Sequence, residues 1–184
     1  MPYKIILLIG PSGSGKTTIG KKLEEKGFLP LVSYTTRNKR PGERFGEDYY
    51  FVPRENFPKE GFVETTEYNN ELYGLTEREV NNKSNMGHTY LVCDEHGASE
   101  MLRLYSYQAV PFFINVKPST ALARMKKRGD KRERALERMV HAVEKSEFTM
   151  PKSFDCYEIN GEASTDEQVA YIEKIILKRV RGVL

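Results

Sequence analysis

Residues 10–17 read Gly10-Pro11-Ser12-Gly13-Ser14-Gly15-Lys16-Thr17 and fit the pattern G-x-x-x-x-G-K-[ST]. The apolar run 4–9 before them predicts a buried strand, and Ile19 and Leu23 after them recur at helical spacing. Glycines between a strand and a helix let successive backbone N–H groups point into one concavity, where the helix N-terminus adds partial positive charge. The stretch therefore predicts a cradle for the phosphates of a nucleoside triphosphate. In such a cradle Lys16 would reach the β- and γ-phosphates, and the Thr17 hydroxyl would ligate Mg²⁺.

Composition indicates an ordinary globular chain of 184 residues, 39% hydrophobic and 30% charged, long enough for one domain with a sizeable core. The net charge of +3 is too small to indicate a nucleic-acid partner. Cys93 and Cys156 give neither metal spacing nor a disulfide framework, so we expect buried free thiols. The apolar start is too short for a signal peptide or a membrane span, so we expect a cytoplasmic protein with no membrane partner.

Strands and helices are expected to alternate through most of the chain. Strands are predicted at 4–9, 28–33, 89–94, 111–116 and 155–160. Helices are predicted from the phosphate loop to Gly27, over about 98–108, over 119–128 with Pro118 in the first turn, from a break at 129–130 to about 148, and from a capping box at 165–168 onward. The last helix would bury Val169, Ile172, Ile176 and Val180. This alternation predicts an α/β fold with a mainly parallel sheet and helices on both faces.

Two further regions carry distinctive patterns. Region 33–88 is predicted to form a small inserted sheet with strands at 49–52 and 61–68, followed by a helix that a capping box at 76–79 opens. Within it, residues 34–44 hold four basic side chains against one acid, and residues 124–138 hold eight against three, a local net charge of +5. Taken alone, such basic runs are usually a solvated loop and a solvated helix face, but Arg and hydroxyl donors also suit a phosphate ligand.

The segment Ser33-x-Thr35-Thr36-Arg37-x-x-Arg40-Pro41-Gly42-Glu43-x-x-Gly46-x-Asp48-Tyr49-x-Phe51-Val52 resembles the nucleotide-binding signature of guanylate kinases. The likeness covers essentially the whole chain. It continues in Phe62-Val63-Glu64, Tyr73-Gly74, Asp94-x-x-Gly97-Ala98, Arg124-x-x-x-Arg128-Gly129, the helix of Arg138 and Ile159-Asn160.

The resemblance implies a three-layer P-loop fold and an ATP-dependent transfer of phosphate to GMP. It implies a core at 1–32 and 90–184, a GMP-binding insertion at 33–89, and a helical lid at 118–146. The substrates would be ATP and GMP, also dGMP, with Mg²⁺ as the cofactor, in a monomer or homodimer. By matching positions, ATP would be bound by Gly10, Pro11, Ser12, Gly13, Ser14, Gly15, Lys16, Thr17, Thr18, Arg128 and Asn160.

The same resemblance assigns the GMP site and the catalytic charges. Ser33, Arg37, Arg40, Tyr49 and Tyr73 match the positions that hold the GMP phosphate, and Glu64 and Asp94 match those that read the guanine edge. Lys16, Arg37, Arg124, Arg128 and Arg138 would supply positive charge to the group in flight.

Two positions depart from the family's pattern. Leu75 stands where the family usually has a Ser or Thr that contacts the base, with Thr76 one step later. Val92 stands where the first acid of Asp-x-Asp is usual, and only Asp94 remains. We expect the first change to weaken base binding and the second to lower the rate.

Three alternatives remain at this point. A monophosphate kinase with another base preference would agree with Leu75. A non-catalytic guanylate-kinase-like module that binds proteins would have a damaged phosphate loop, whereas Lys16 and Thr17 stand here. A regulatory GTPase is suggested by the D-x-x-G pattern at 94–97, but that class needs an N-K-x-D motif that residues 114–118 do not provide.

Overall fold

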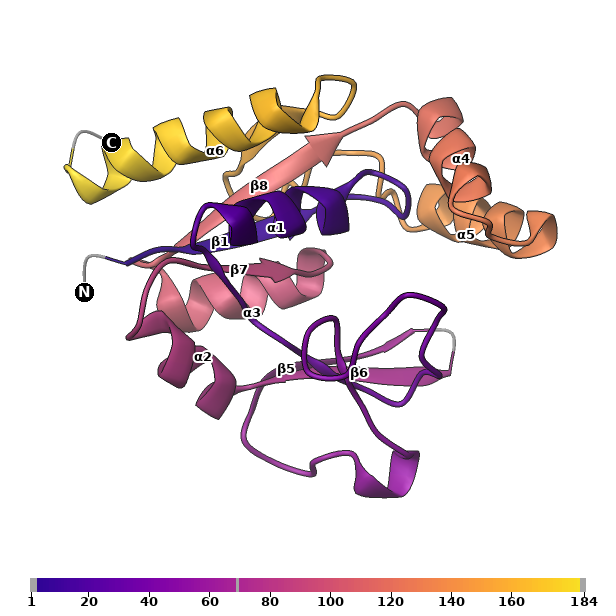
Figure 1. The fold of residues 1–184 in the computed structure, drawn as a ribbon, viewed down its shortest axis with the longest axis horizontal. Coiled ribbons are helices and arrows are strands. Elements are labelled where there is room, and N and C mark those ends of the chain that lie inside the picture. Colours follow the sequence, from indigo (N-terminus) through magenta and orange to yellow (C-terminus); the bar gives the residue numbers. More distant parts are fainter. Residues whose placement is uncertain (1–2, 69, 183–184) are drawn as a thin grey trace.

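The computed structural model describes residues 3–68 and 70–182 and has two sheets. The larger sheet is parallel, with strand order β2-β7-β1-β8-β9 (Figure 1). Its strands are β1 (Ile5–Ile9), β2 (Leu29–Pro30), β7 (Thr89–Val92), β8 (Ala109–Asn115) and β9 (Tyr157–Asn160). The central strand β1 is buried along its whole length, as expected of an apolar strand that has a neighbour on each side.

Helices cover both faces of this sheet, which makes three layers. Alternate residues of β1 separate the two cores: Ile6 and Leu8 pack with α1 (Lys16–Glu25) and α6 (Thr165–Val180). Ile5 and Leu7 face the other way and pack with α3 (Glu95–Tyr105) and α2 (Glu77–Ser84). The three-layer α/β fold predicted from the sequence is confirmed.

The smaller sheet has the order β4-β3-β6-β5 and lies beyond α3 (Figure 1). Its strands are β3 (Tyr34–Thr35), β4 (Tyr50–Phe51), β5 (Phe62–Tyr68) and β6 (Glu71–Thr76), with a short 3₁₀ helix η1 (Arg54–Asn56) between β4 and β5. The sequence predicted β4 and β5 but missed β3 and β6. β3 is only two residues long, and β6 is stabilised by its antiparallel partners rather than by an alternating pattern of its own.

Two helices project from the carboxyl end of β8. These are α4 (Pro118–Lys127), with Pro118 in its first turn as predicted, and α5 (Arg132–Glu144). Gly129 between them has φ of 92°, a conformation that glycine adopts at little cost. The domain boundaries 33–89 and 118–146 stay predictions.

Several local predictions need correction. The N-cap of α6 is Ser164 rather than Thr165, because Ser164 forms the complete capping box with Glu167. The box predicted at 76–79 is half formed: Thr76 accepts from the Glu79 backbone, but the Glu79 carboxylate binds the Val32 N–H instead. Val180 is 41% exposed, so it is not a core residue.

Other errors concern the ends of elements. Of the predicted strand 28–33, only residues 29–30 form a strand. Helix α5 ends at Glu144 rather than near 148. Helix α3 begins at Glu95 instead of about 98, because the Asp94 side chain caps it. Cys93 and Cys156 are only partly buried, so the expectation of buried thiols was wrong in degree, although both are free.

Candidate functional site

The phosphate loop connects β1 to α1 through three glycines with positive φ, Gly10, Gly13 and Gly15. The Lys16 amine folds back over the loop and donates to the carbonyl oxygens of Gly10 and Pro11. Burial lowers the pKa of Lys16 to about 8, with the carboxylates of Glu147 and Asp94 acting in the opposite direction. The Lys16 ammonium group is thus hydrogen-bonded to carbonyl oxygens instead of water, and the oxygens of a bound phosphate could replace those carbonyls as its acceptors.

Helix α4 lies directly against this loop. A Cβ at Gly13 would be 2.4 Å from the carbonyl oxygen of Ala121, which is a steric clash, so only glycine fits at this position. The Arg124 guanidinium donates to the carbonyl oxygens of Ser14 at 2.9 Å and Gly161 at 2.8 Å. Arg124 thus binds α4 to the phosphate loop and to the turn after β9.

A second group of polar side chains lies on the small-sheet side. Arg37 donates to both carboxylate oxygens of Glu43, at 2.9 and 2.8 Å, and its guanidinium lies 5.4 Å from the ring centre of Tyr49. Tyr49 in turn packs edge-on against Tyr73. Burial, with Tyr73 beside it, raises the pKa of Tyr49 to about 12, so its hydroxyl stays protonated as a potential donor.

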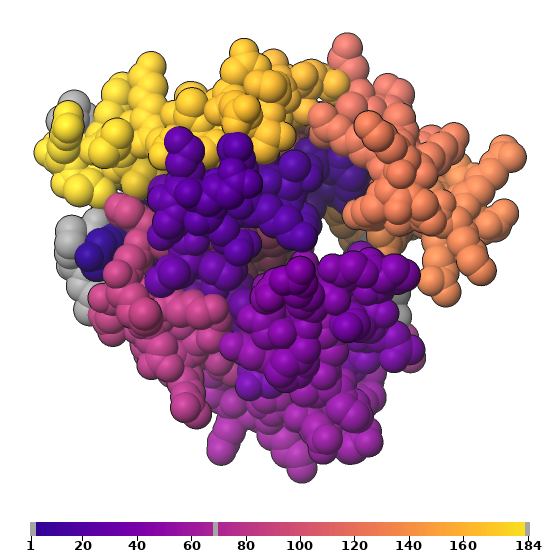
Figure 2. Space-filling model, viewed as in Figure 1, coloured from indigo at the N-terminus to yellow at the C-terminus, as the bar shows by residue number. Residues whose placement is uncertain are grey.

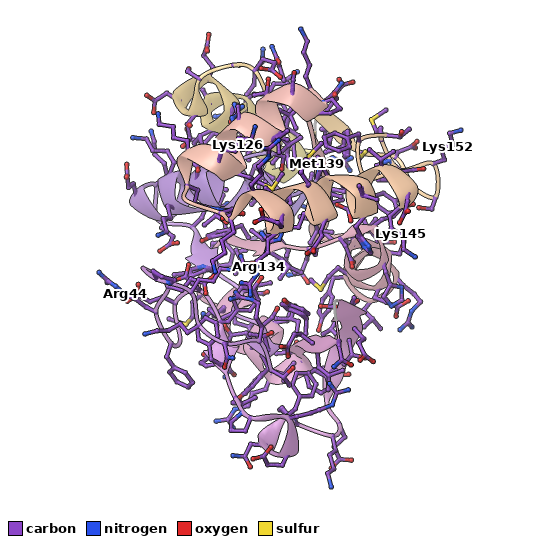
Figure 3. All side chains as sticks on the ribbon, turned by 90° about the vertical axis from the view of Figure 1, so that its right-hand side faces the viewer. Arg44, Lys126, Arg134, Met139, Lys145 and Lys152 are labelled. Atoms are coloured by element: carbon purple, nitrogen blue, oxygen red, sulfur yellow. The ribbon has the colours of Figure 1, made fainter. Side chains whose placement is uncertain are left out.

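Arg40 follows Arg37 and faces arginines of the two projecting helices. Burial lowers the pKa of Arg40, and so do the nearby charges of Arg138, Arg37 and Arg128. We call Arg37, Arg40, Arg128 and Arg138 the arginine cluster. Figure 2 shows a hollow between α4–α5 and the small-sheet side of the molecule. In Figure 3, the labelled Arg134 also extends from α5 toward the small sheet.

Asp130 binds the two arginines on the α4–α5 side. Its carboxylate accepts two bonds from Arg128, with Nε at 3.0 Å, and one from Arg138 Nη1 at 3.3 Å. Although burial acts to raise it, the pKa of Asp130 lies below its usual range because of Arg128, Arg138 and Arg40. Asp130 therefore stays ionised and neutralises part of the cluster.

Two carboxylates meet where β5 passes the start of α3. Glu64 is 9% exposed, and a Cβ at Gly97 would lie 3.4 Å from its carboxyl carbon and 3.5 Å from an Asp94 oxygen. Burial and the Asp94 charge raise the pKa of Glu64 to about 7. Asp94 is exposed and accepts from the Gly97 N–H at 2.8 Å. The pair can accept hydrogen bonds from neighbouring N–H groups of a base.

The residues at the mouth of the loop fit a magnesium ion bound mostly through phosphates and water. Thr17 is exposed at the start of α1, where its hydroxyl is free to ligate a cation. Within 3–68 and 70–182, no three His, Cys, Asp or Glu side chains form a metal-binding group. Mg²⁺ usually takes few protein ligands and keeps substrate oxygens and waters, so this donor set suits it.

The structure brings most of the predicted site residues together. The loop residues 10–18, Arg124 and Asp94 gather around Lys16, while Arg37, Arg40, Tyr49 and Tyr73 form one group with Arg128 and Arg138 opposite. Ser33 is buried at the start of the small-sheet segment. Asn160 is exposed at the end of β9, and its side-chain oxygen accepts from the Glu162 N–H at 3.0 Å.

Sequence reasoning missed three acids of the site. Glu43 lies within the quoted signature, and Asp130 is one of three acids in a strongly basic stretch, so a search for counter-ions would have found both. Glu147, whose charge acts on Lys16, had no signal, because the turn after α5 brings it there.

The two departures from the expected pattern are structurally different. Leu75 is fully buried in the core cluster with Val63 and Val80, and Thr76 caps α2. Val92 packs against the opposite core.

This arrangement of phosphate loop, parallel sheet and facing arginines defines a P-loop kinase. A family model described as guanylate kinase matches residues 3–179, and the chain belongs to the guanylate kinase family. Curated guanylate kinases of Mycoplasmopsis pulmonis (strain UAB CTIP) and Homo sapiens are 35% and 30% identical. The first alignment covers 97% of this chain and 96% of the relative, the second 96% and 93%.

Solved structures agree with this assignment. The crystal structure of guanylate kinase from Anaplasma phagocytophilum is 26% identical, with a TM-score of 0.66 over 95% of this chain and 84% of that one. A gluconokinase from Sinorhizobium meliloti 1021, 14% identical with a TM-score of 0.57, covers 99% of this chain and 95% of its own and shares the fold. Across the described residues, no helix is both long and apolar enough to cross a membrane. The chain is thus an enzyme of the guanylate kinase family, a nucleoside monophosphate kinase.

Proposed function

We propose that this enzyme transfers the γ-phosphate of ATP to GMP, and to dGMP, with Mg²⁺ as cofactor. The observation that carries the proposal is the distribution of charge around the hollow. The arginine cluster and Lys16 offer five cations, and the carboxylates of Glu64 and Asp94 lie together at the start of α3. A purine monophosphate that has N–H donors on its base and a dianion at its other end complements both features.

In this proposal the phosphates of ATP bind the loop 10–18, and Lys16 exchanges its two carbonyl partners for phosphate oxygens. Arg37 and Arg40 bind the GMP phosphate with the hydroxyls of Tyr49 and Tyr73 and with Ser33. Arg128 and Arg138 stabilise the group in flight. Such positive charge lowers the barrier because negative charge spreads over the equatorial oxygens in the transition state.

Arg124 has a different part in the proposal. Its guanidinium already donates to two backbone oxygens, so it keeps α4 against the loop while ATP binds. Asn160, at the end of β9, would line the nucleotide end of the ATP site. Mg²⁺, held by Thr17 and phosphate oxygens, would neutralise charge on the triphosphate. The cytoplasmic location expected from the sequence stays a prediction.

Base recognition rests on Glu64 and Asp94. An ionised carboxylate at Glu64 accepts from guanine N1–H, and Asp94 accepts from the exocyclic amine. A base without those donors leaves the carboxylates unpaired, and such mismatches reach about 10⁴-fold in selectivity.

The test is a coupled kinase assay that compares kcat/KM for GMP, dGMP, IMP, AMP, UMP and dTMP with ATP and Mg²⁺. We expect GMP to exceed IMP and AMP, and Lys16→Ala to abolish transfer to all of them. A tenfold preference for AMP or a pyrimidine nucleotide would refute the guanine assignment.

That last outcome is the second candidate, a monophosphate kinase with another base preference. It is favoured by one observation: Leu75, at the position where the family usually has a Ser or Thr that contacts the base, is fully buried and offers no hydroxyl. The panel decides between the two.

A further inference from the structure

Asp130 lies in the turn between α4 and α5 and receives an arginine from each side. The Asp130 side chain is 17% exposed, and that of Arg138 is 18% exposed, whereas that of Arg128 is 49% exposed. Two parallel bonds from one guanidinium fix its plane as well as its position. The geometry is that of a built ion-pair network rather than of a solvated surface pair.

The network connects an anchored helix to a less anchored one. Helix α4 is fixed to the phosphate loop by Arg124 and by the contact of Gly13 with Ala121, and Met125 is fully buried. Helix α5 follows Gly129, which is exposed, and a Cβ added to that glycine would meet no heavy atom within 4 Å. Asp130 therefore ties the Arg138 side chain on α5 to the Arg128 side chain at the end of anchored α4.

Without the Asp130 carboxylate, the guanidinium groups of Arg128, Arg138 and Arg40 would repel one another. Burial and the positive charges of Arg138 and Arg128 lower the pKa of Arg40, and within this set Asp130 is the acid that contacts both Arg128 and Arg138. Guanidinium groups that repel one another turn outward to water unless an anion holds them. The side chains would then be ordered only after phosphates bind, and part of the binding energy would be spent on that ordering.

We propose that Asp130 is a positioning residue that holds Arg128 and Arg138 on one point facing Arg40 before nucleotides bind. The proposal rests on the proposed phosphoryl transfer and adds to it a residue that touches no substrate. It predicts that the loss of this carboxylate acts on kcat, because the two arginines no longer meet the transferring group in the right geometry. The KM for the monophosphate, which binds on the small-sheet side, changes little.

The first arm of the test is kinetic. Asp130→Asn removes the charge at almost constant size, Asp130→Glu restores it, and Glu137→Gln removes an exposed acid of the neighbouring helix α5 as a matched control. We expect Asp130→Asn to lower kcat about 10- to 100-fold, the range for a misplaced catalytic group, with KM for the monophosphate within about threefold. Glu137→Gln should match the wild type, and Asp130→Glu should recover part of the loss.

A double-mutant cycle separates positioning from a structural role. If Asp130 acts through Arg138, then adding Asp130→Asn to the Arg138→Lys variant should lower kcat further by less than about threefold. The proposal would be overturned if the two substitutions lowered kcat independently, so that their effects multiplied in the double variant. It would also be overturned if Asp130→Asn kept the wild-type kcat, or if its melting temperature fell far enough to explain the lost activity.

The second arm does not depend on activity. Arginine side-chain Nε–H relaxation, measured by NMR on the nucleotide-free protein, reports the mobility of Arg128 and Arg138 directly. We expect both to become mobile in Asp130→Asn and to stay ordered in Glu137→Gln, and equal rigidity in all three proteins would overturn the proposal. If the wild type transfers phosphate to no monophosphate, the proposed function fails, and this arm still decides the role of Asp130.

Discussion

Gly13 in the phosphate loop and Ala121 in α4 are in backbone contact, with room between them for a hydrogen atom but not for a methyl group. Gly13 also has φ of 82°, which L-residues rarely adopt. The conformation of the loop thus depends on a helix that begins more than 100 residues later in the chain. Arg124 reinforces the same contact from the α4 side.

Replacement of Gly13 by Ala should therefore damage both folding and catalysis. The left-handed backbone costs about 1–2 kcal/mol for alanine, and displacement of α4 adds to that cost. At about 2–4 °C per kcal/mol for a chain of this size, we expect the melting temperature to fall by at least about 2–8 °C, with a large loss of kcat. Gly87→Ala is the control, because Gly87 has its nearest neighbour at 3.9 Å and no positive φ. Equal melting temperatures for the two variants would contradict this account of Gly13.

Lys16→Met should abolish transfer, by about 10³-fold or more in kcat, without loss of stability at pH 7. The pKa of Lys16 is about 8 in the folded protein, below the ordinary value of 10.5, because burial disfavours the charged amine. The unfolded chain thus binds more protons between pH 8 and 10.5, and the stability of the wild type relative to Lys16→Met should rise across that window. Denaturant titrations at pH 7 and pH 10 measure the free energy of unfolding of the wild type relative to Lys16→Met. If that difference fell between pH 7 and pH 10, the pKa of Lys16 would not be lowered in the folded protein.

The loss of the Lys16 proton at high pH also predicts a pH limit for the reaction. The amine must be charged to bind phosphates, so kcat/KM for ATP, which reports the free enzyme, should decline above about pH 8. The rate at saturating nucleotide should persist to higher pH, because phosphates favour the charged amine.

Glu64→Gln should weaken GMP use and remove a pH dependence of stability. The pKa of Glu64 is raised to about 7 by burial and by Asp94, so the folded protein binds more protons than the unfolded chain between pH 4.5 and 7. Stability due to Glu64 is present below pH 4.5 and is lost as the pH rises through 7, so Glu64→Gln should be more stable than the wild type at pH 8.

For GMP we expect kcat/KM of Glu64→Gln to fall about 10- to 100-fold at pH 8, the value of one charged hydrogen bond. Glu67→Gln is the matched control, an exposed acid on the same strand. Unchanged discrimination between GMP and AMP, whose base has no N1–H, would remove Glu64 from base recognition.

Leu75→Ser should destabilise the protein rather than simply restore a base contact. Leu75 is fully buried in the core between the two sheets, so the loss of its side chain and the burial of a hydroxyl should cost about 2–5 kcal/mol. Leu177→Ser, at a position 55% exposed on α6, should cost about 0.5 kcal/mol. Urea unfolding of both variants checks this, and equal midpoints would show that Leu75 is not a core residue.

The sequence by itself determined the chemistry that depends on local pattern. The phosphate loop between an apolar strand and a helix needs only the residues 4–23, so its position, its glycines and Lys16 were predictable. Pro118 and Gly129 likewise delimit α4 through their own backbone preferences. The alternation of strands and helices was enough to predict the three-layer fold.

Short elements without a local pattern were not predictable. Strand β3 has two residues, and β6 owes its strand to β3 and β5 on either side. Val180 repeats the apolar spacing of α6, but the helix has passed the edge of the core there and leaves it exposed.

Only the tertiary structure decided which charges meet. Asp130 and Arg138 are eight residues apart and Lys16 and Glu147 more than a hundred, and no periodicity in the sequence relates either pair. The raised pKa of Glu64 and the lowered pKa of Lys16 come from burial, which depends on how β5, α3 and the phosphate loop pack together. The reason is physical: hydrophobic period and turn preference act over a few residues, whereas desolvation and Coulomb interactions act through space.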